Sequence, residues 1–312
     1  MARLAFFDVH CHLQDSRIAH CAPLLLKQAS EAGVRWFAVN GTSEEDWADV
    51  KEMSQTHSNV IPNFGLHPWW IPGRSPKWSS VLREMLEANP TAAVGEIGLD
   101  LGKRGREIDE ALQLEILKEQ LTIAREFNRP ASIHNVRAID PLQKLLAEMG
   151  NFPAGLIMHS FVGPADAVRG LAKHGAYFSF SGFITPLKET KARAILEQVP
   201  QDRILLETDT PDALPKVESK LLFPVPGDPA SHSGDESVTK TGGGDHKSCC
   251  SGKIDGRTKV NESEMSLNHP GNITAVLKHV SSLMGISEEE LSSLALENAR
   301  RIFSFPGSKI SC

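Results

Sequence analysis

The stretch FFDVHCHL, residues 6–13, begins as an apolar strand and ends in two histidines. Because side chains alternate along a strand, Asp8, His10 and His12 are expected on one face, and Val9 on the other. One histidine in a buried strand is usually a hydrogen-bonded core residue. Two in register behind a carboxylate instead favour a metal site.

The same pattern, an apolar strand followed by a helix, repeats along the chain. Strands buried on both faces and separated by helices form parallel sheets, and eight such units close into a (β/α)8 TIM barrel. An open, doubly wound sheet is the alternative. We expect strands near residues 4–10, 34–40, 60–66, 91–99, 130–134, 154–161, 176–183 and 203–209. Helices are expected near residues 21–32, 43–57, 77–89, 105–128, 138–150, 164–175, 188–199 and 273–285.

The last of these helices is delayed by a long segment, residues 216–268, which is rich in Gly, Ser, Lys and Asp and has no aromatic after Phe223. Such a segment buries too little apolar surface to offset the entropy lost on ordering. Without it about 260 residues remain, close to the ~250 residues of one barrel. We therefore predict a single domain over residues 1–312 that contains a flexible, low-complexity insertion at 216–268.

Composition restricts the functions that are open to the chain. Its net charge of −6 argues against a basic surface that binds nucleic acid by bulk electrostatics, and the sequence has no basic stretch with interleaved aromatics. Any nucleic-acid binding must therefore occur at a local site. The insertion contains His246, Cys249 and Cys250, but no second pair with zinc-finger spacing, so we expect no zinc there.

The expected location is the cytoplasm, with the nucleus as the alternative. The sequence shows no secretory leader, and no apolar run approaches the ~18 residues of a membrane span. Its five cysteines have no CxxC spacing, which is typical of reduced thiols in an intracellular protein. We expect no membrane association and no obligate protein partner.

Further histidines and carboxylates stand at the carboxyl ends of other predicted strands. In a barrel these ends form one rim, and barrel enzymes place their active sites there. Any one of these residues alone is weak evidence, but six at corresponding places in five strands are hard to arrange by chance. The predicted metal ligands are His10, His12, Glu96, His134, His159 and Asp209.

Four imidazoles and two carboxylates are too many for one tetrahedral ion, but they suit two cations that share a bridging carboxylate. A water in such a centre loses a proton near neutral pH and becomes the nucleophile, and Asp209 could accept that proton. The predicted reaction is metal-assisted hydrolysis of an ester or amide. Imidazole ligands favour zinc, manganese or iron over magnesium. We assign one ion to His10, His12 and Asp209, the other to His134 and His159, and the bridge to Glu96.

Together the motifs FDVHCHL, GLHP, GEIGLD, SIHNVRA, MHSF and LLETDTP, with the tail NHPGNI…LALENARRIF, resemble the TatD family of metal-dependent deoxyribonucleases, which are amidohydrolase-like barrels. The resemblance covers nearly all of the chain except residues 216–268. It implies two divalent ions (Mg²⁺, Zn²⁺ or Mn²⁺) per chain, held at the six positions above, with Glu96 and Asp209 as catalytic residues. It also implies hydrolysis of DNA phosphodiester bonds, commonly as a 3′ to 5′ exonuclease.

The resemblance also suggests residues that contact the substrate. His67 of GLHP would lie near the scissile phosphate, although a histidine before proline at a strand end is as often structural. Arg137 would contact a phosphate, and we place Glu207 with these substrate contacts. The chain departs from the family pattern twice. Two residues instead of one separate His134 from Arg137, which could turn the arginine outward. Asp212 follows ETDTP where the family usually has an aromatic, which adds negative charge near the mouth.

Three functions follow from these observations. The first, which we favour, is a two-metal nuclease acting on DNA ends or single strands. The second is a hydrolase of small amides, lactones or phosphoesters on the same barrel, because fold and metals alone do not determine the substrate. The third is a catalytically weak metal-binding scaffold whose insertion recruits a partner. The complete ligand set argues against the third.

Overall fold

Eight parallel strands, hydrogen-bonded in chain order from β1 to β8, form the centre of the molecule. The computed structural model describes residues 4–228 and 266–310. The last strand returns to the first, because the backbone N–H of Asp209 donates to His10 O at 2.9 Å and that of His12 to Thr210 O at 2.6 Å. The strands are β1 Phe6–Cys11, β2 Val34–Asn40, β3 Val60–Phe64, β4 Ala93–Asp100, β5 Ala131–Val136, β6 Leu156–Met158, β7 Ala176–Phe180 and β8 Ile204–Leu206.

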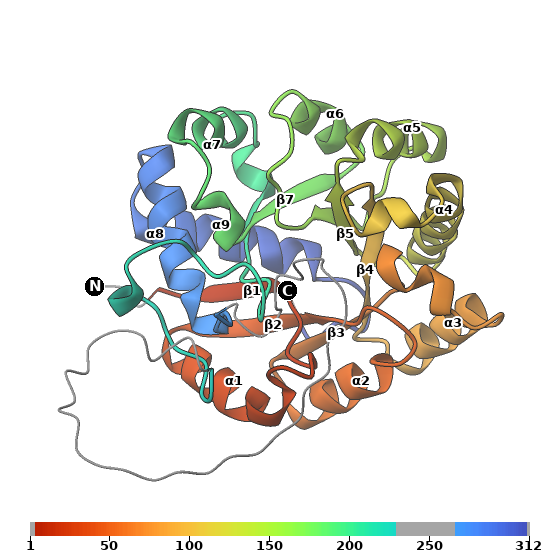
Figure 1. Cartoon of the computed structure of the whole chain (residues 1–312), viewed down its shortest axis with the longest axis horizontal. Helices are drawn as coiled ribbons and strands as arrows, with labels where there is room; N and C mark the ends of the chain where they lie inside the picture. The colour runs from red at the N-terminus through yellow and green to blue at the C-terminus, as the bar shows by residue number, and fades with distance from the viewer. Residues whose placement is uncertain (1–3, 229–265, 311–312) are drawn as a thin grey trace, which may run out of the picture.

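Helices alternate with the strands and surround them as an outer ring (Figure 1). The predicted TIM barrel is therefore confirmed. In the described residues no helix is both long and apolar enough to cross a membrane. The helices that alternate with the strands are α1 Ala22–Glu31, α2 Trp47–Thr56, α3 Trp78–Ala88, α4 Glu110–Glu126, α5 Ile139–Met149, α6 Ala167–Lys173, α7 Glu189–Leu196 and α8 Ile273–Met284.

A further helix that the sequence analysis did not separate, α9 Glu288–Ile302, packs against β1 and β8. Its N-terminus has the capping and charge pattern that stabilises helices. The Ser287 side chain caps the N-terminus by accepting the Glu290 N–H at 3.1 Å, and acidic side chains fill the first turn. Just beyond the helix, the Phe303 ring stacks on Phe7 with ring centres 4.7 Å apart. The helix and the residues after it therefore cover the amino-terminal end of the barrel.

Strand β1 does not keep the regular alternation that the sequence analysis assumed. Between its pairings Asp8↔Phe37 and Cys11↔Val39 it advances three residues while β2 advances two. The Asp8 carboxylate accepts the backbone N–H of Thr208 at 2.9 Å and its hydroxyl at 2.5 Å. The expectation that Asp8 shares a face with the histidines is therefore wrong, because a bulge places an extra residue in this strand.

The two ends of the predicted insertion pack on the barrel. Residues 216–228 and 266–268 are described, and Val225 and Asp228 among them are buried. The Asp228 carboxylate accepts the backbone N–H of Leu267 at 2.8 Å, which joins the two ends of the segment. The rest of the predicted insertion, residues 229–265 with His246, Cys249 and Cys250, lies outside the described residues.

His269 precedes α8 and makes stability depend on pH. Its Nδ1 accepts the Gly271 N–H at 2.8 Å, its Nε2 lies 3.1 Å from Gln28 Oε1, and burial lowers its pKa to about 4. The unfolded chain takes up this proton near pH 6.5, so the contribution of neutral His269 is complete above that pH and is lost as the pH falls toward 4.

We predict that His269→Asn removes this part of the pH dependence, because Asn keeps an acceptor for Gly271 but does not titrate. Between pH 7 and pH 4 the wild-type free energy of unfolding should fall by about 2 to 3 kcal/mol more than that of the variant. Urea unfolding at both pH values measures the difference. Parallel pH profiles for the two proteins would contradict the assignment.

Candidate metal centre

The carboxylate of Glu96, on β4, lies between two pairs of imidazoles. Its Oε2 is 3.3 Å from His12 Nε2 and 3.7 Å from His10 Nε2. Its Oε1 is 2.8 Å from His159 Nε2 and 3.0 Å from His134 Nδ1. Each carboxylate oxygen therefore faces its own pair of ring nitrogens, and Glu96 connects the two pairs.

Asp209 completes the group of predicted ligands. Its Oδ1 lies 3.7 Å from His10 Nε2 and 3.6 Å from His12 Nε2, on the same side as Glu96 Oε2. The backbone of Asp209 has φ +56°, as Arg137 has, and Ser160 has φ +46°. Non-glycine residues in this strained conformation concentrate at functional sites. The fold thus brings all six predicted ligands together at the carboxyl ends of the strands.

Contacts on the outer nitrogens of two histidines determine where their protons lie. His12 Nδ1 is 2.8 Å from Asn40 O, and His134 Nε2 is 3.3 Å from Asp100 Oδ2. Carbonyl and carboxylate oxygens only accept, so both outer nitrogens carry a hydrogen. In the neutral rings the opposite nitrogens, His12 Nε2 and His134 Nδ1, therefore direct lone pairs at the centre of the cluster, as metal ligands must.

On the corresponding nitrogen, His10 has a hydrogen-bond partner, whereas His159 has a carboxylate nearby but no hydrogen bond among the described residues. His10 Nδ1 is 2.7 Å from the Ser132 hydroxyl, and His159 Nδ1 is 3.5 Å from Glu207 Oε1. We expected Glu207 to contact substrate, but it is fully buried behind His159. One of its oxygens accepts the Ser160 N–H and hydroxyl, both at 2.7 Å, and the other accepts the Ser179 hydroxyl. Glu207 therefore fits the role of orienting His159 and not that of contacting substrate.

His67 has the opposite orientation. Its Nδ1 accepts the Trp69 N–H at 3.1 Å, so in the neutral ring the hydrogen is on Nε2. That nitrogen lies 3.6 Å from Glu96 Oε1. Burial, helped by the neighbouring His134, keeps the His67 pKa well below its usual value, and the ring is therefore neutral. His67 thus offers a hydrogen-bond donor to the centre, while the neutral rings of His12 and His134 offer acceptors.

The charges in the cluster suit a cation. His10 Nε2 and His12 Nε2 are 3.1 Å apart, and His159 Nε2 and His134 Nδ1 are 3.4 Å apart, so lone pairs would face each other unless positive charge lies between them. Burial opposes charge on His12 and on His159, yet the nearby carboxylates raise both pKa values well above the usual range.

The pKa of Glu96 is shifted in the direction that favours its charged form. Burial alone would raise its pKa, but the surrounding imidazoles, His67 and His159 first and then His10 and His12, hold the pKa well below its usual value. An ionised carboxylate surrounded by imidazole nitrogens is a typical donor set for zinc, manganese or iron, and the donors here fit such ions.

Two predicted features of the rim differ in their surroundings. Arg137 is exposed, and its side chain has no hydrogen bond or ion pair with another described residue. The extra negative charge expected from Asp212 is paired, because both of its oxygens accept from the Arg17 guanidinium at 2.9 Å. Asp212 is therefore held in an ion pair with Arg17, which also pairs with Asp15.

Sequence analysis missed the residues that hold the histidines in place. Asp100 is buried, accepts the Trp69 indole N–H at 2.6 Å and contacts His134. It stands four residues after Glu96 in the same strand, and this even spacing is the signal that could have identified it. Ser132 and Asn40 lie on other strands, and no local pattern marks them.

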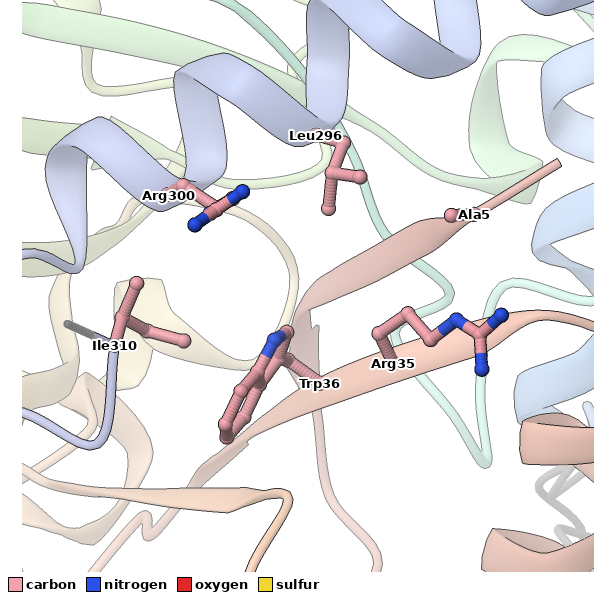
Figure 2. Close-up of a pocket in the computed structure, with 6 residues that line it drawn as sticks. All are labelled: Ala5, Arg35, Trp36, Leu296, Arg300 and Ile310. Atoms are coloured by element: carbon pink, nitrogen blue, oxygen red, sulfur yellow. The ribbon is translucent and has the colours of Figure 1, made fainter. Parts of the chain in front are cut away.

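A cavity of about 290 Å³ lies elsewhere in the barrel, at the amino ends of β1 and β2 beside α9 (Figure 2). It is lined by Ala5, Arg35, Trp36, Leu296, Arg300 and Ile310 and contains none of the predicted site residues. The metal centre is therefore at the opposite end of the barrel from this cavity.

Comparisons with known proteins agree with this arrangement. The model of the family described as TatD related DNase matches residues 7–304. A Bacillus subtilis protein named uncharacterized metal-dependent hydrolase YabD is 26% identical over 297 residues, which are 95% of this chain and 98% of that protein. The Escherichia coli protein named 3′-5′ ssDNA/RNA exonuclease TatD is 26% identical over 215 residues, 67% of this chain and 80% of its own. The solved structure of the E. coli TatD homologue YjjV has a TM-score of 0.75 at 24% identity and covers 96% of this chain and 98% of its own.

We predict that Asp100→Asn weakens divalent-metal binding about tenfold, because loss of the carboxylate loosens the His134 ring. Competition with a chromophoric chelator measures the affinity for zinc and manganese. The matched control is Asp140→Asn, at an exposed position on α5, which should bind metal like the wild type. Equal affinity in both variants would show that Asp100 does not hold His134 for metal binding.

Proposed function

The chain belongs to the TatD-related DNase family, and we propose that it is a metal-dependent hydrolase that cleaves phosphodiester bonds of DNA, removing nucleotides from the 3′ end of single strands. One observation carries the proposal. Glu96 sits between two pairs of imidazole nitrogens, with one oxygen toward each pair. This is the donor arrangement that two divalent ions with a shared carboxylate require.

The chain's own residues divide into ligands and groups that act on the substrate. Bound divalent ions would supply positive charge to the phosphate and lower the pKa of a water. The donors would be grouped as His10, His12 and Asp209 for one ion, and His134 and His159 for the other, with Glu96 shared between them.

Three side chains are proposed to act on the reacting groups. The Asp209 carboxylate, at the mouth beside His10, would accept the proton that the attacking water loses. The Nε2–H of His67 points into the same space and would donate to a phosphate oxygen. Arg137 is exposed at the end of β5 and would pair with the next phosphate of the nucleic acid.

A net charge of −6 is compatible with a polyanionic substrate, because the positive charge is local. The centre would present cations at one point, and the Asp212 carboxylate at the mouth pairs with Arg17, which it shares with Asp15. A relative that is 26% identical is named as a 3′-5′ exonuclease of single-stranded DNA and RNA, which supports the choice of substrate.

We predict that metal-stripped protein does not shorten a 5′-labelled single strand of DNA, and that zinc, manganese or magnesium restores shortening from the 3′ end. Glu96→Gln should lower the metal-restored rate at least about 100-fold, because the amide cannot provide a charged oxygen to both halves of the centre. Gel analysis of the shortened products gives both the rate and the direction.

Glu84→Gln, the same substitution at an exposed position on α3, should keep the wild-type rate, and circular dichroism should show that both variants are folded. A metal-loaded wild type that cleaves a lactone, an amide or an aryl ester but no phosphodiester would replace the nuclease with the small-molecule hydrolase. Loss of every hydrolytic activity in the metal-loaded protein would favour the scaffold function.

A further inference from the structure

Beside the metal centre, two loops bring aromatic and basic side chains together. Trp69 and Trp70 belong to the 3₁₀ helix η2, Pro68–Gly73, which follows β3, whereas Arg104 belongs to the loop after β4. The guanidinium carbon of Arg104 lies 4.2 Å from the centre of the Trp69 ring and 5.3 Å from that of Trp70. The tertiary structure thus brings aromatic side chains of one loop against a basic side chain of another.

The two tryptophans have different surroundings. Trp69 is half-buried and donates its indole N–H to Asp100, and its ring centre is 4.8 Å from that of His67. Trp70 is 43% exposed, and its indole N–H donates to no group in the described part of the chain. Trp69 is therefore part of the wall of the metal centre, and Trp70 extends that wall outward as a surface that a planar group can contact.

Exposed basic side chains also lie at this place. Lys103, Arg104 and Arg106 are all exposed, and none forms a salt bridge among the described residues. Arg137, at the end of the adjacent strand β5, is exposed on the same rim. In a chain of net charge −6, unpaired cations beside one another on the rim that carries the metal centre complement a polyanion.

We propose that Trp70 and the basic loop 103–106 form a subsite for a single-stranded nucleic acid, in which a base stacks on Trp70 while Lys103, Arg104 and Arg106 contact the phosphates. This subsite rests on the proposed nuclease function, because it leads the strand to the metal centre. Every base has a face that can stack on an aromatic ring, so the subsite tolerates any sequence. Bases in a duplex are already stacked on one another, so a duplex is excluded.

Binding to the metal-loaded protein tests the subsite without turnover. The first probe is a fluorescent 12-nucleotide oligothymidylate with phosphorothioate linkages, and the second is an abasic strand of the same length and charge. Fluorescence anisotropy gives both affinities. Trp70→Ala should weaken oligothymidylate binding about tenfold and leave the abasic strand unchanged, because only the first probe has bases to stack. Trp70→Phe, which keeps an aromatic ring, should retain most of the affinity.

The charge contribution is tested separately. Arg104→Gln should weaken both probes by a similar factor, and its effect should diminish as salt is raised. Leu24→Ala on α1 is the control for Trp70, because Leu24 is 44% exposed, and Arg35→Gln at the far end of the barrel is the control for Arg104. Neither control should change the affinity for either probe.

The possible outcomes separate this subsite from the proposed function. Unchanged oligothymidylate binding in Trp70→Ala, equal losses for both probes, or equally tight binding of a blunt duplex would each overturn the subsite. None of these results would affect the hydrolysis of bis(p-nitrophenyl) phosphate, which tests the nuclease proposal alone. Absence of that hydrolysis together with a Trp70-dependent preference for bases would overturn the nuclease and leave a single-strand binding surface.

Discussion

The structure depends on burying an ionised carboxylate among imidazoles at one end of a barrel. A buried charge is tolerated only if nearby groups compensate for it, and Glu96 has a ring nitrogen within 3.7 Å on each side. Those rings need partners in turn, which Asn40 provides from β2, Ser132 from β5 and Asp100 from β4, the strand of Glu96 itself. A closed barrel can meet this requirement, because its strands all end at the same rim.

The partners also determine which ring nitrogen of each histidine faces the centre with a lone pair and which with a hydrogen. Acceptors behind His12 and His134 hold the ring hydrogens outward and leave lone pairs for cations, whereas a backbone donor behind His67 turns its hydrogen inward. One cluster of histidines therefore contains both candidate metal ligands and a hydrogen-bond donor. The residue type is the same in each case, and the atom behind the ring determines the role.

The charged side chains on the rim differ in whether they are paired. The molecule is acidic, yet the rim around the centre combines paired acids with unpaired bases. Asp212 is matched by Arg17, while Arg104 lies over Trp69 and remains free to interact with solvent and ligands. The strand that carries Glu96 ends at Asp100, which contacts His134. The loop that bears Arg104 follows directly after Asp100. Binding of a strand and support of the metal centre therefore share one segment of the chain.

The repeat of strands and helices, and the position of the candidate ligands at the strand ends, could be inferred from the sequence alone. Eight apolar runs alternating with helices determined the barrel, and histidines and carboxylates at the ends of those runs identified the six candidate ligands, because both patterns are periodic and local. The tertiary structure decided what depends on neighbours distant in sequence. A bulge turned Asp8 away to Thr208, burial placed Glu207 behind His159, and α9 closed the barrel floor. The pairing of Trp70 with Arg104 belongs to the same class, because strand order brings two loops together that no spacing along the chain connects.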